Sequence, residues 1–124
     1  MSLTKWIEKG EFVSYGCSFT APHKMKIAVI PVGYFEGYPR IAGSKKAKVI
    51  INGVLCSLLG RVCMNMMVVD VTKVESPKVG DIVTLIGGDK QVQITAEDVA
   101  GWSQTINYEV VTRLNPLVER KVVV

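Results

Sequence analysis

Short apolar runs separated by turn-forming residues constrain the fold of this chain more than any other feature. The run KIAVIPV at Lys26–Val32 has the length of one buried strand. Asn52-Gly53 fits a tight hairpin turn, because both residues tolerate positive φ. Pro77–Asp81 is a second turn signal, and Gly87-Gly88-Asp89 would end a further strand. We expect strands at Phe12–Thr20, Lys26–Val32, Ala47–Ile51, Val54–Leu58, Arg61–Val71 with a bend near Met64-Asn65, Ile82–Ile86, Tyr108–Leu114 and Val118–Val124.

One helix is expected at Ala96–Gln104. Thr95 is placed as its N-cap, and two acids in the next residues would face the positive end of the helix dipole. Val99, Trp102 and Ile106 follow at roughly helical spacing. The fold class is therefore mainly β, a closed or partly open Greek-key-like β-barrel with one short α-helix near 96–104.

The 124 residues form a single domain, with no repeat and no linker. We set Met1–Leu3 aside as residues that an expression vector could have added. No apolar stretch approaches the length of a membrane span, and the N-terminus does not resemble a signal peptide. We expect a cytoplasmic protein that does not bind a membrane.

The net charge of +4 does not indicate a nucleic-acid partner. The tightest basic group is Lys45-Lys46 with Lys48, and the aromatic residues lie away from it, so we expect a solvated loop there. The three cysteines form no CxxC pair, and His23 is not spaced with them as a zinc ligand would be. Buried free thiols and no metal site are expected.

Common enzyme signatures such as GxSxG, a phosphate-binding Gly-Lys loop and HExxH are missing. Four other motifs stand in order along the chain. Each alone has an ordinary structural explanation, since tyrosine is common in strands and glycine in turns. They are Val13-Ser14-Tyr15-Gly16, the loop GYFEGYPR from Gly33 to Arg40, Gly60-Arg61-Val62-Cys63-Met64-Asn65, and Ile106-Asn107-Tyr108-Glu109.

Together these motifs resemble the C-terminal domain of alanine racemases over about residues 11–113. The resemblance implies interconversion of L- and D-alanine on pyridoxal phosphate, whose ring absorbs negative charge when the α-proton leaves. Inversion needs a base on each face of the substrate. In the family one base is the cofactor-bearing lysine of an N-terminal (β/α)₈ barrel, and the other is a tyrosine from the partner subunit's C-terminal domain.

By motif match, the tyrosine base is Tyr15, and the backbone N–H of Met64 binds the substrate carboxylate. Tyr108 matches a tyrosine that hydrogen-bonds the cofactor phosphate of its own subunit. The full enzyme would then be at least a head-to-tail homodimer. Four residues match those that line the narrow access route to the active site: Tyr34, Arg40, Arg61 and Ile106.

The chain departs from the family pattern at three places. Asn65 replaces an aspartate, Glu36 replaces an aspartate in the GY-DG loop, and the terminal VERKVVV lacks the usual tyrosine. No lysine lies in a motif for the cofactor, and no segment upstream of Tyr15 is long enough for a barrel. We therefore expect the isolated chain to be inactive.

The sequence leaves two other hypotheses about the function open. The first is a non-catalytic β-barrel module for oligomerisation or small-ligand binding. The second is a related racemase for serine or for an amino acid with a larger side chain. The length of the natural reading frame distinguishes the module from the enzyme domain.

Overall fold

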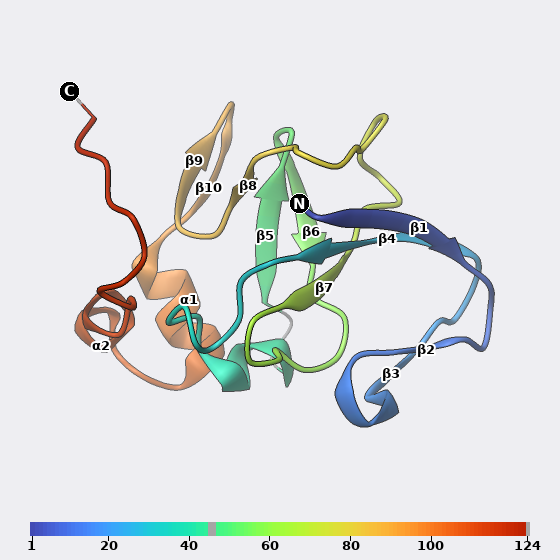
Figure 1. Ribbon diagram of the computed structural model, residues 1–124, viewed down its shortest axis with the longest axis horizontal. Helices are drawn as coiled ribbons and strands as arrows, with labels where there is room; N and C mark the ends of the chain where they lie inside the picture. Colours follow the sequence, from blue (N-terminus) through green and yellow to red (C-terminus); the bar gives the residue numbers. More distant parts are fainter. Residues whose placement is uncertain (45–46, 124) are drawn as a thin grey trace.

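The computed structural model describes residues 1–44 and 47–123. Two three-stranded antiparallel sheets form its centre (Figure 1). The first has the order β1 (Leu3–Ile7), β4 (Met25–Ile30), β7 (Met67–Asp70), and the second has the order β6 (Val54–Ser57), β5 (Lys48–Ile51), β8 (Val83–Thr84). Two smaller pairs are β2 (Phe12–Val13) with β3 (Phe19–Thr20), and β9 (Gly87–Asp89) with β10 (Val92–Ile94).

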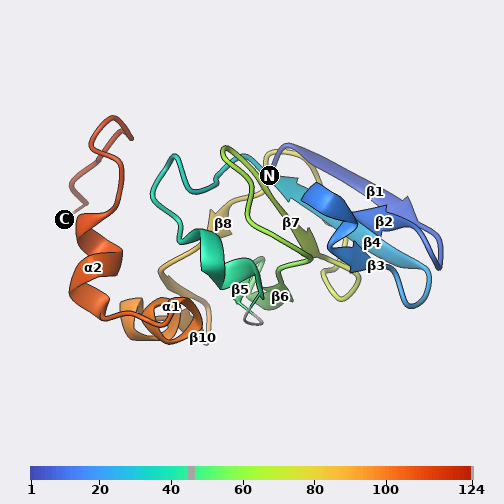
Figure 2. The ribbon, with the colours of Figure 1, turned by 90° about the horizontal axis from the view of Figure 1, so that it is seen from below.

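The helices and the β2–β3 pair lie at opposite ends of the molecule (Figures 1 and 2). The helices are α1 (Ala96–Ser103) and α2 (Asn107–Thr112), and a short 3₁₀ helix, η2 (Arg40–Ser44), contacts α1. An isolated bridge between Leu58, which follows β6, and Val69 in β7 joins the two larger sheets. No sheet among the described residues closes on itself, so the mainly β class is confirmed and the expected barrel is not.

The two central strands are buried on both faces, which explains their continuous apolar sequence. In β4, Ile27 packs in one core cluster and Ala28 in another. In β5, Val49 and Ile50 divide between two clusters in the same way. Successive side chains of a strand point to opposite faces, so each strand separates two hydrophobic cores.

Two local predictions are confirmed. Asn52 and Gly53 have φ of 51° and 80° and connect β5 to β6, which pair antiparallel. Helix α1 begins after Thr95, whose hydroxyl accepts a hydrogen bond from the Asp98 N–H while the Asp98 carboxylate accepts one from the Thr95 N–H. Both signals act within a few residues, which is why the sequence alone predicted them.

The expected strand at Phe12–Thr20 is wrong in its middle part. Ser14 and Gly16 have φ of 71° and 68°, and a 3₁₀ turn, η1 (Tyr15–Cys17), lies between β2 and β3. A strand cannot continue through positive φ. The residues set aside at the N-terminus also belong to the fold, because Leu3 begins β1 opposite Val29.

Two further strands are shorter than expected. Within Arg61–Val71 only Met67–Asp70 is a strand, because residues 61–66 form a loop whose carbonyls bind a neighbouring loop instead of a strand partner. Within Ile82–Ile86 only Val83–Thr84 pairs, and Ile82 is 83% exposed, so this segment is not a buried strand. Gly87–Asp89 does not end that strand but forms β9.

The segment expected as a strand at Tyr108–Leu114 begins instead as helix α2. Val110 is buried against α1, and the Asn107 side chain accepts a hydrogen bond from the Tyr108 N–H and donates one to Glu97. These contacts override the β preference of the Val-Val-Thr run. The expected strand at Val118–Val124 is also wrong, since residues 118–123 pair with no strand and Val122 is 94% exposed.

Parts of two predictions, for Lys45-Lys46 and Val124, lie outside the described residues. In the part of the chain that the structure describes, no helix has the length and apolarity needed to cross a bilayer.

Candidate functional site

Five of the seven predicted site residues line one pocket, which we call the tyrosine pocket. It encloses about 440 Å³ and is formed by Tyr15, Tyr34, Arg40, Arg61, Val62, Cys63 and Met64. These residues come from three of the four motifs and are separated by up to 49 positions (15 to 64). The fold therefore brings together residues that the sequence pattern singled out one motif at a time.

Tyr15 stands on the η1 turn and is 73% exposed, so its phenol faces outward and is not sealed in the core. Ser14 holds this turn in place. Its hydroxyl donates to the Arg61 carbonyl and accepts from the Arg61 N–H, both at 2.9 Å. Ser18 accepts from the same N–H at 3.2 Å. The turn that carries Tyr15 is thus attached to the start of the loop that carries Met64.

The loop at residues 61–66 presents Met64 with its side chain 56% exposed. Cys63 N–H donates to the Met66 carbonyl, and the Met64 carbonyl accepts from Phe35 N–H. The Met64 N–H has no hydrogen-bond acceptor among the described residues. A backbone N–H without an acceptor in the protein can donate to a carboxylate ligand without breaking a hydrogen bond of the fold.

The loop at residues 33–38 lies directly against this segment. Tyr34 N–H donates to the Cys63 carbonyl at 3.1 Å, and Phe35 N–H to the Met64 carbonyl at 2.9 Å. Gly33 permits the approach, because a Cβ there would overlap the carbonyl oxygens of Cys63 and Met64. Main-chain hydrogen bonds therefore hold the Tyr34 backbone against the loop at residues 61–66.

The tyrosine pocket has a positive electrostatic character. Arg40 and Arg61 line it, and no acidic side chain and no lysine does so among the described residues. The Arg61 guanidinium lies beside Gly16, where a Cβ would be 3.6 Å from its Nη1. Two cations favour an anionic ligand. The pocket can therefore bind a carboxylate near a phenol.

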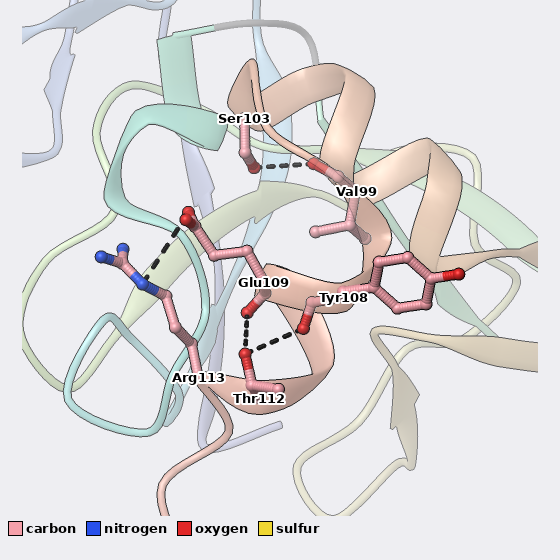
Figure 3. Close-up of polar contacts among 6 residues, drawn as sticks. All are labelled: Val99, Ser103, Tyr108, Glu109, Thr112 and Arg113. Atoms are coloured by element: carbon pink, nitrogen blue, oxygen red, sulfur yellow. Dashed lines mark hydrogen bonds and ion pairs between the residues drawn. The ribbon is translucent and has the colours of Figure 1, made fainter.

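A second cavity of about 580 Å³ shares Arg40 and Arg61 with the tyrosine pocket. It also includes residues of the helical end of the molecule: Pro39, Ile41, Ser103, Thr105, Glu109, Val110 and Arg113. Figure 3 shows the helix side chains of this wall, with Glu109 and Arg113 paired at 3.8 Å and the Ser103 hydroxyl bonded to the Val99 carbonyl. An exposed pair at this distance contributes little stability.

Tyr108 and Ile106 are not part of the tyrosine pocket. In Figure 3 the Tyr108 ring and the Glu109–Arg113 pair extend from opposite sides of α2. Tyr108 is 72% exposed, and its hydroxyl has no hydrogen-bond partner among the described residues. Ile106 is the N-cap residue of α2 and is also exposed.

The thiols differ from one another, and the prediction that all are buried is wrong. Cys56 is buried, Cys63 is half-buried in the tyrosine pocket, and Cys17 is exposed on η1. Burial raises the pKa of the Cys56 thiol to about 11, which leaves it protonated at neutral pH. No group of three His, Cys, Asp or Glu side chains within residues 1–44 and 47–123 could hold a metal ion.

Sequence reasoning missed Val62 and Cys63 as pocket residues, although both lie inside the quoted motif GRVCMN. It also missed the role of Ser14. The adjacent Ser-Tyr pair was visible, but its partner Arg61 is 47 residues away and only the fold connects the two.

The comparisons with known proteins are consistent with one another. A profile of the family described as "Alanine racemase, C-terminal domain" matches residues 1–122. An alanine racemase of Leptospira interrogans is 42% identical over 112 residues, which are 90% of this chain and 28% of that protein. One of Symbiobacterium thermophilum is 42% identical over 120 residues, 97% of this chain and 32% of that protein. The structure of alanine racemase from Acinetobacter baumannii matches with a TM-score of 0.84 at 40% identity, over 94% of this chain and 31% of that one.

Proposed function

The chain belongs to the family of alanine racemase C-terminal domains, and on this premise we propose that it supplies half of the active site of a racemase for L- and D-alanine. The chain spans about a third of the length of the curated relatives that it matches. The proposed activity is therefore that of a longer protein. The isolated chain is expected to be inactive.

Tyr15 is proposed as the base on one face of the substrate. Its phenol is exposed, and it lines the same pocket as Arg61 and Met64. The base on the other face is proposed to come from outside this chain, since no lysine of the described residues lines the tyrosine pocket. Each base removes the α-proton of one enantiomer, and the other returns a proton on the opposite face.

Met64 is proposed to bind the substrate carboxylate through its N–H, which has no acceptor within the described chain. Arg40, Arg61 and Tyr34 would narrow the route to the phenol and favour small anionic groups. Ile106 would line the same route from the α2 end.

Pyridoxal phosphate is the proposed cofactor, and the hydrogen-bond donors of this chain would hold only part of it. The exposed Tyr108 hydroxyl, without a partner here, can donate to a phosphate oxygen. When bound, the cofactor withdraws the negative charge left on the substrate carbon. Tyr108 lies away from the tyrosine pocket, so the two ends of this chain would serve two different cofactors in a homodimer.

The observation that carries this proposal is the meeting of the Tyr15 phenol, an N–H without an acceptor and two guanidinium groups in one pocket, which no lysine or acidic side chain of the described residues lines. The test is Tyr15→Phe in the full-length protein. We expect the racemisation rate to fall at least about a hundredfold, the contribution of one general base. Exchange of the α-proton in D₂O should persist for one enantiomer and disappear for the other.

Tyr38→Phe is the matched control. It removes the same hydroxyl from a tyrosine that is 4% exposed and outside the tyrosine pocket, so racemisation should stay close to that of the wild type. Loss of exchange for both enantiomers in Tyr15→Phe, or no loss of racemisation, would show that Tyr15 is not a base on one face only.

A further inference from the structure

Two loops form the wall of the tyrosine pocket that carries Tyr34 and Met64, and their side chains meet at one point. The Asn65 Nδ2 donates to the Glu36 Oε1 at 3.1 Å. The other carboxylate oxygen of Glu36 accepts from the Gly33 N–H at 2.7 Å. Both oxygens of one half-buried carboxylate are therefore used, one within its own loop and one across to the loop at residues 61–66.

We infer that Glu36 and Asn65 are a positioning pair, which fixes Tyr34 and the Met64 N–H at the spacing that substrate binding needs. This inference rests on the proposed function. Neither side chain lines the tyrosine pocket itself, so each acts through the neighbouring residue of its loop. Asn65 directly follows Met64, and Glu36 closes the turn that begins at Gly33 and Tyr34.

The chemistry of the pair requires one donor and one acceptor. A carboxylate only accepts hydrogen bonds, whereas an amide also donates them. Aspartate at position 65 would place a second carboxylate against Glu36, and two like charges at hydrogen-bond distance repel. Both positions were noted above as departures from the family motif. Their contact makes the two departures one matched change.

The length of the acid matters as well. Aspartate at position 36 would be shorter by one carbon–carbon bond, about 1.5 Å. It could not keep both the Gly33 contact at 2.7 Å and the Asn65 contact at 3.1 Å without moving the backbone. The backbone has little freedom there, because Gly33 lies so close to the Cys63 and Met64 carbonyls that a Cβ at this position would overlap them.

The test is a cycle of variants in the full-length protein: Asn65→Asp, Glu36→Gln, and both together. Asn65→Asp should raise the KM for alanine about tenfold with a smaller change in kcat, a factor typical of coupled neighbouring residues. The double variant restores a donor opposite an acceptor, and its KM should return to within about threefold of the wild type. A purely structural loss would not be reversed by adding a second substitution.

Asn52→Asp is the matched control. The Asn52 side chain donates to the Asp81 carboxylate at 3.1 Å in the hairpin turn, so the same substitution creates the same repulsion away from the tyrosine pocket. It should leave the KM unchanged. An equal KM increase in Asn52→Asp, or no recovery in the double variant, overturns the inference.

Amide NMR spectra of the 124-residue chain separate this inference from the proposed function. The Gly33 and Met64 amide signals should shift in Asn65→Asp and return in the double variant. If the wild-type protein had no racemase activity, the proposed function would be refuted. These amide shifts would still show whether Glu36 and Asn65 position the two loops. If the enzyme is active but the Gly33 and Met64 signals do not change in Asn65→Asp, the positioning role of the pair is refuted.

Discussion

At the scale of single residues, one glycine sets how closely the two pocket loops approach. Gly33 has no strained φ, and its importance is steric, because any side chain would meet the Cys63 and Met64 carbonyls. The loop hydrogen bonds from Tyr34 and Phe35 depend on that approach.

We therefore expect Gly33→Ala to lower the free energy of unfolding by about 1–3 kcal/mol, the range for overpacking against main chain. Urea denaturation of the chain measures it. Gly101→Ala is the control. No heavy atom lies within 4 Å of a Cβ there, and the position is inside α1, so it should gain about 0.5–1 kcal/mol. Equal effects at both positions would contradict the steric argument.

At the scale of elements, helix α1 depends on a capping box that responds to pH. Hydrogen bonds from the Thr95 N–H and hydroxyl lower the pKa of Asp98. A lowered folded-state pKa means that the carboxylate stabilises the fold above the unfolded-state pKa and that this stability is lost as the pH falls through the folded-state value.

We expect Thr95→Ala to cost about 1 kcal/mol of unfolding free energy at pH 7. The difference from the wild type should shrink as the pH falls below the unfolded-state pKa of about 4 and then through the lower folded-state pKa of Asp98. Urea titrations at several pH values measure both. Asp89→Asn is the control, because the Asp89 carboxylate accepts no hydrogen bond from the described residues. If the difference in unfolding free energy between Thr95→Ala and the wild type did not change with pH, the Asp98 carboxylate would not stabilise the cap through its charge.

The elements that the sequence predicted are those with local signals. The Asn52-Gly53 turn, the Thr95 cap and the apolar run of β4 each depend on residues close in the chain. The elements that it missed depend on distant contacts. Helix α2 is stabilised by burial of Val110 against α1, and η1 by hydrogen bonds of Ser14 to a residue 47 positions away.

The same distinction between local signals and distant contacts applies to the candidate site. Motif resemblance named five of the residues that line the tyrosine pocket, yet it described Glu36 and Asn65 as separate departures. Their side chains are 29 residues apart in the chain, and no sequence spacing shows that they touch. Placing Tyr15 on a strand was wrong for a related reason, since the positive φ of Ser14 has no local sequence signal.

At the scale of the whole molecule, this chain holds one base of the proposed pair and no lysine in the tyrosine pocket among the described residues. Incubation with pyridoxal phosphate followed by borohydride should therefore label no lysine of residues 1–124 stoichiometrically. The full-length protein should be labelled at one lysine outside this range, as peptide mapping by mass spectrometry would show. One fully labelled lysine inside residues 1–124 would contradict the division of the site between two parts of the protein.

Among the described residues, the Ser14 hydroxyl bonds main-chain atoms of Arg61 and not its side chain. Any amino acid except proline at position 61 offers the same carbonyl and N–H, so the anchoring of the turn that carries the phenol does not depend on the Arg61 side chain. Position 14 accepts fewer amino acids, because few side chains can donate and accept a hydrogen bond through one atom. Substitutions at position 61 should leave the η1 turn in place even where they change activity, whereas substitutions at position 14 should displace it.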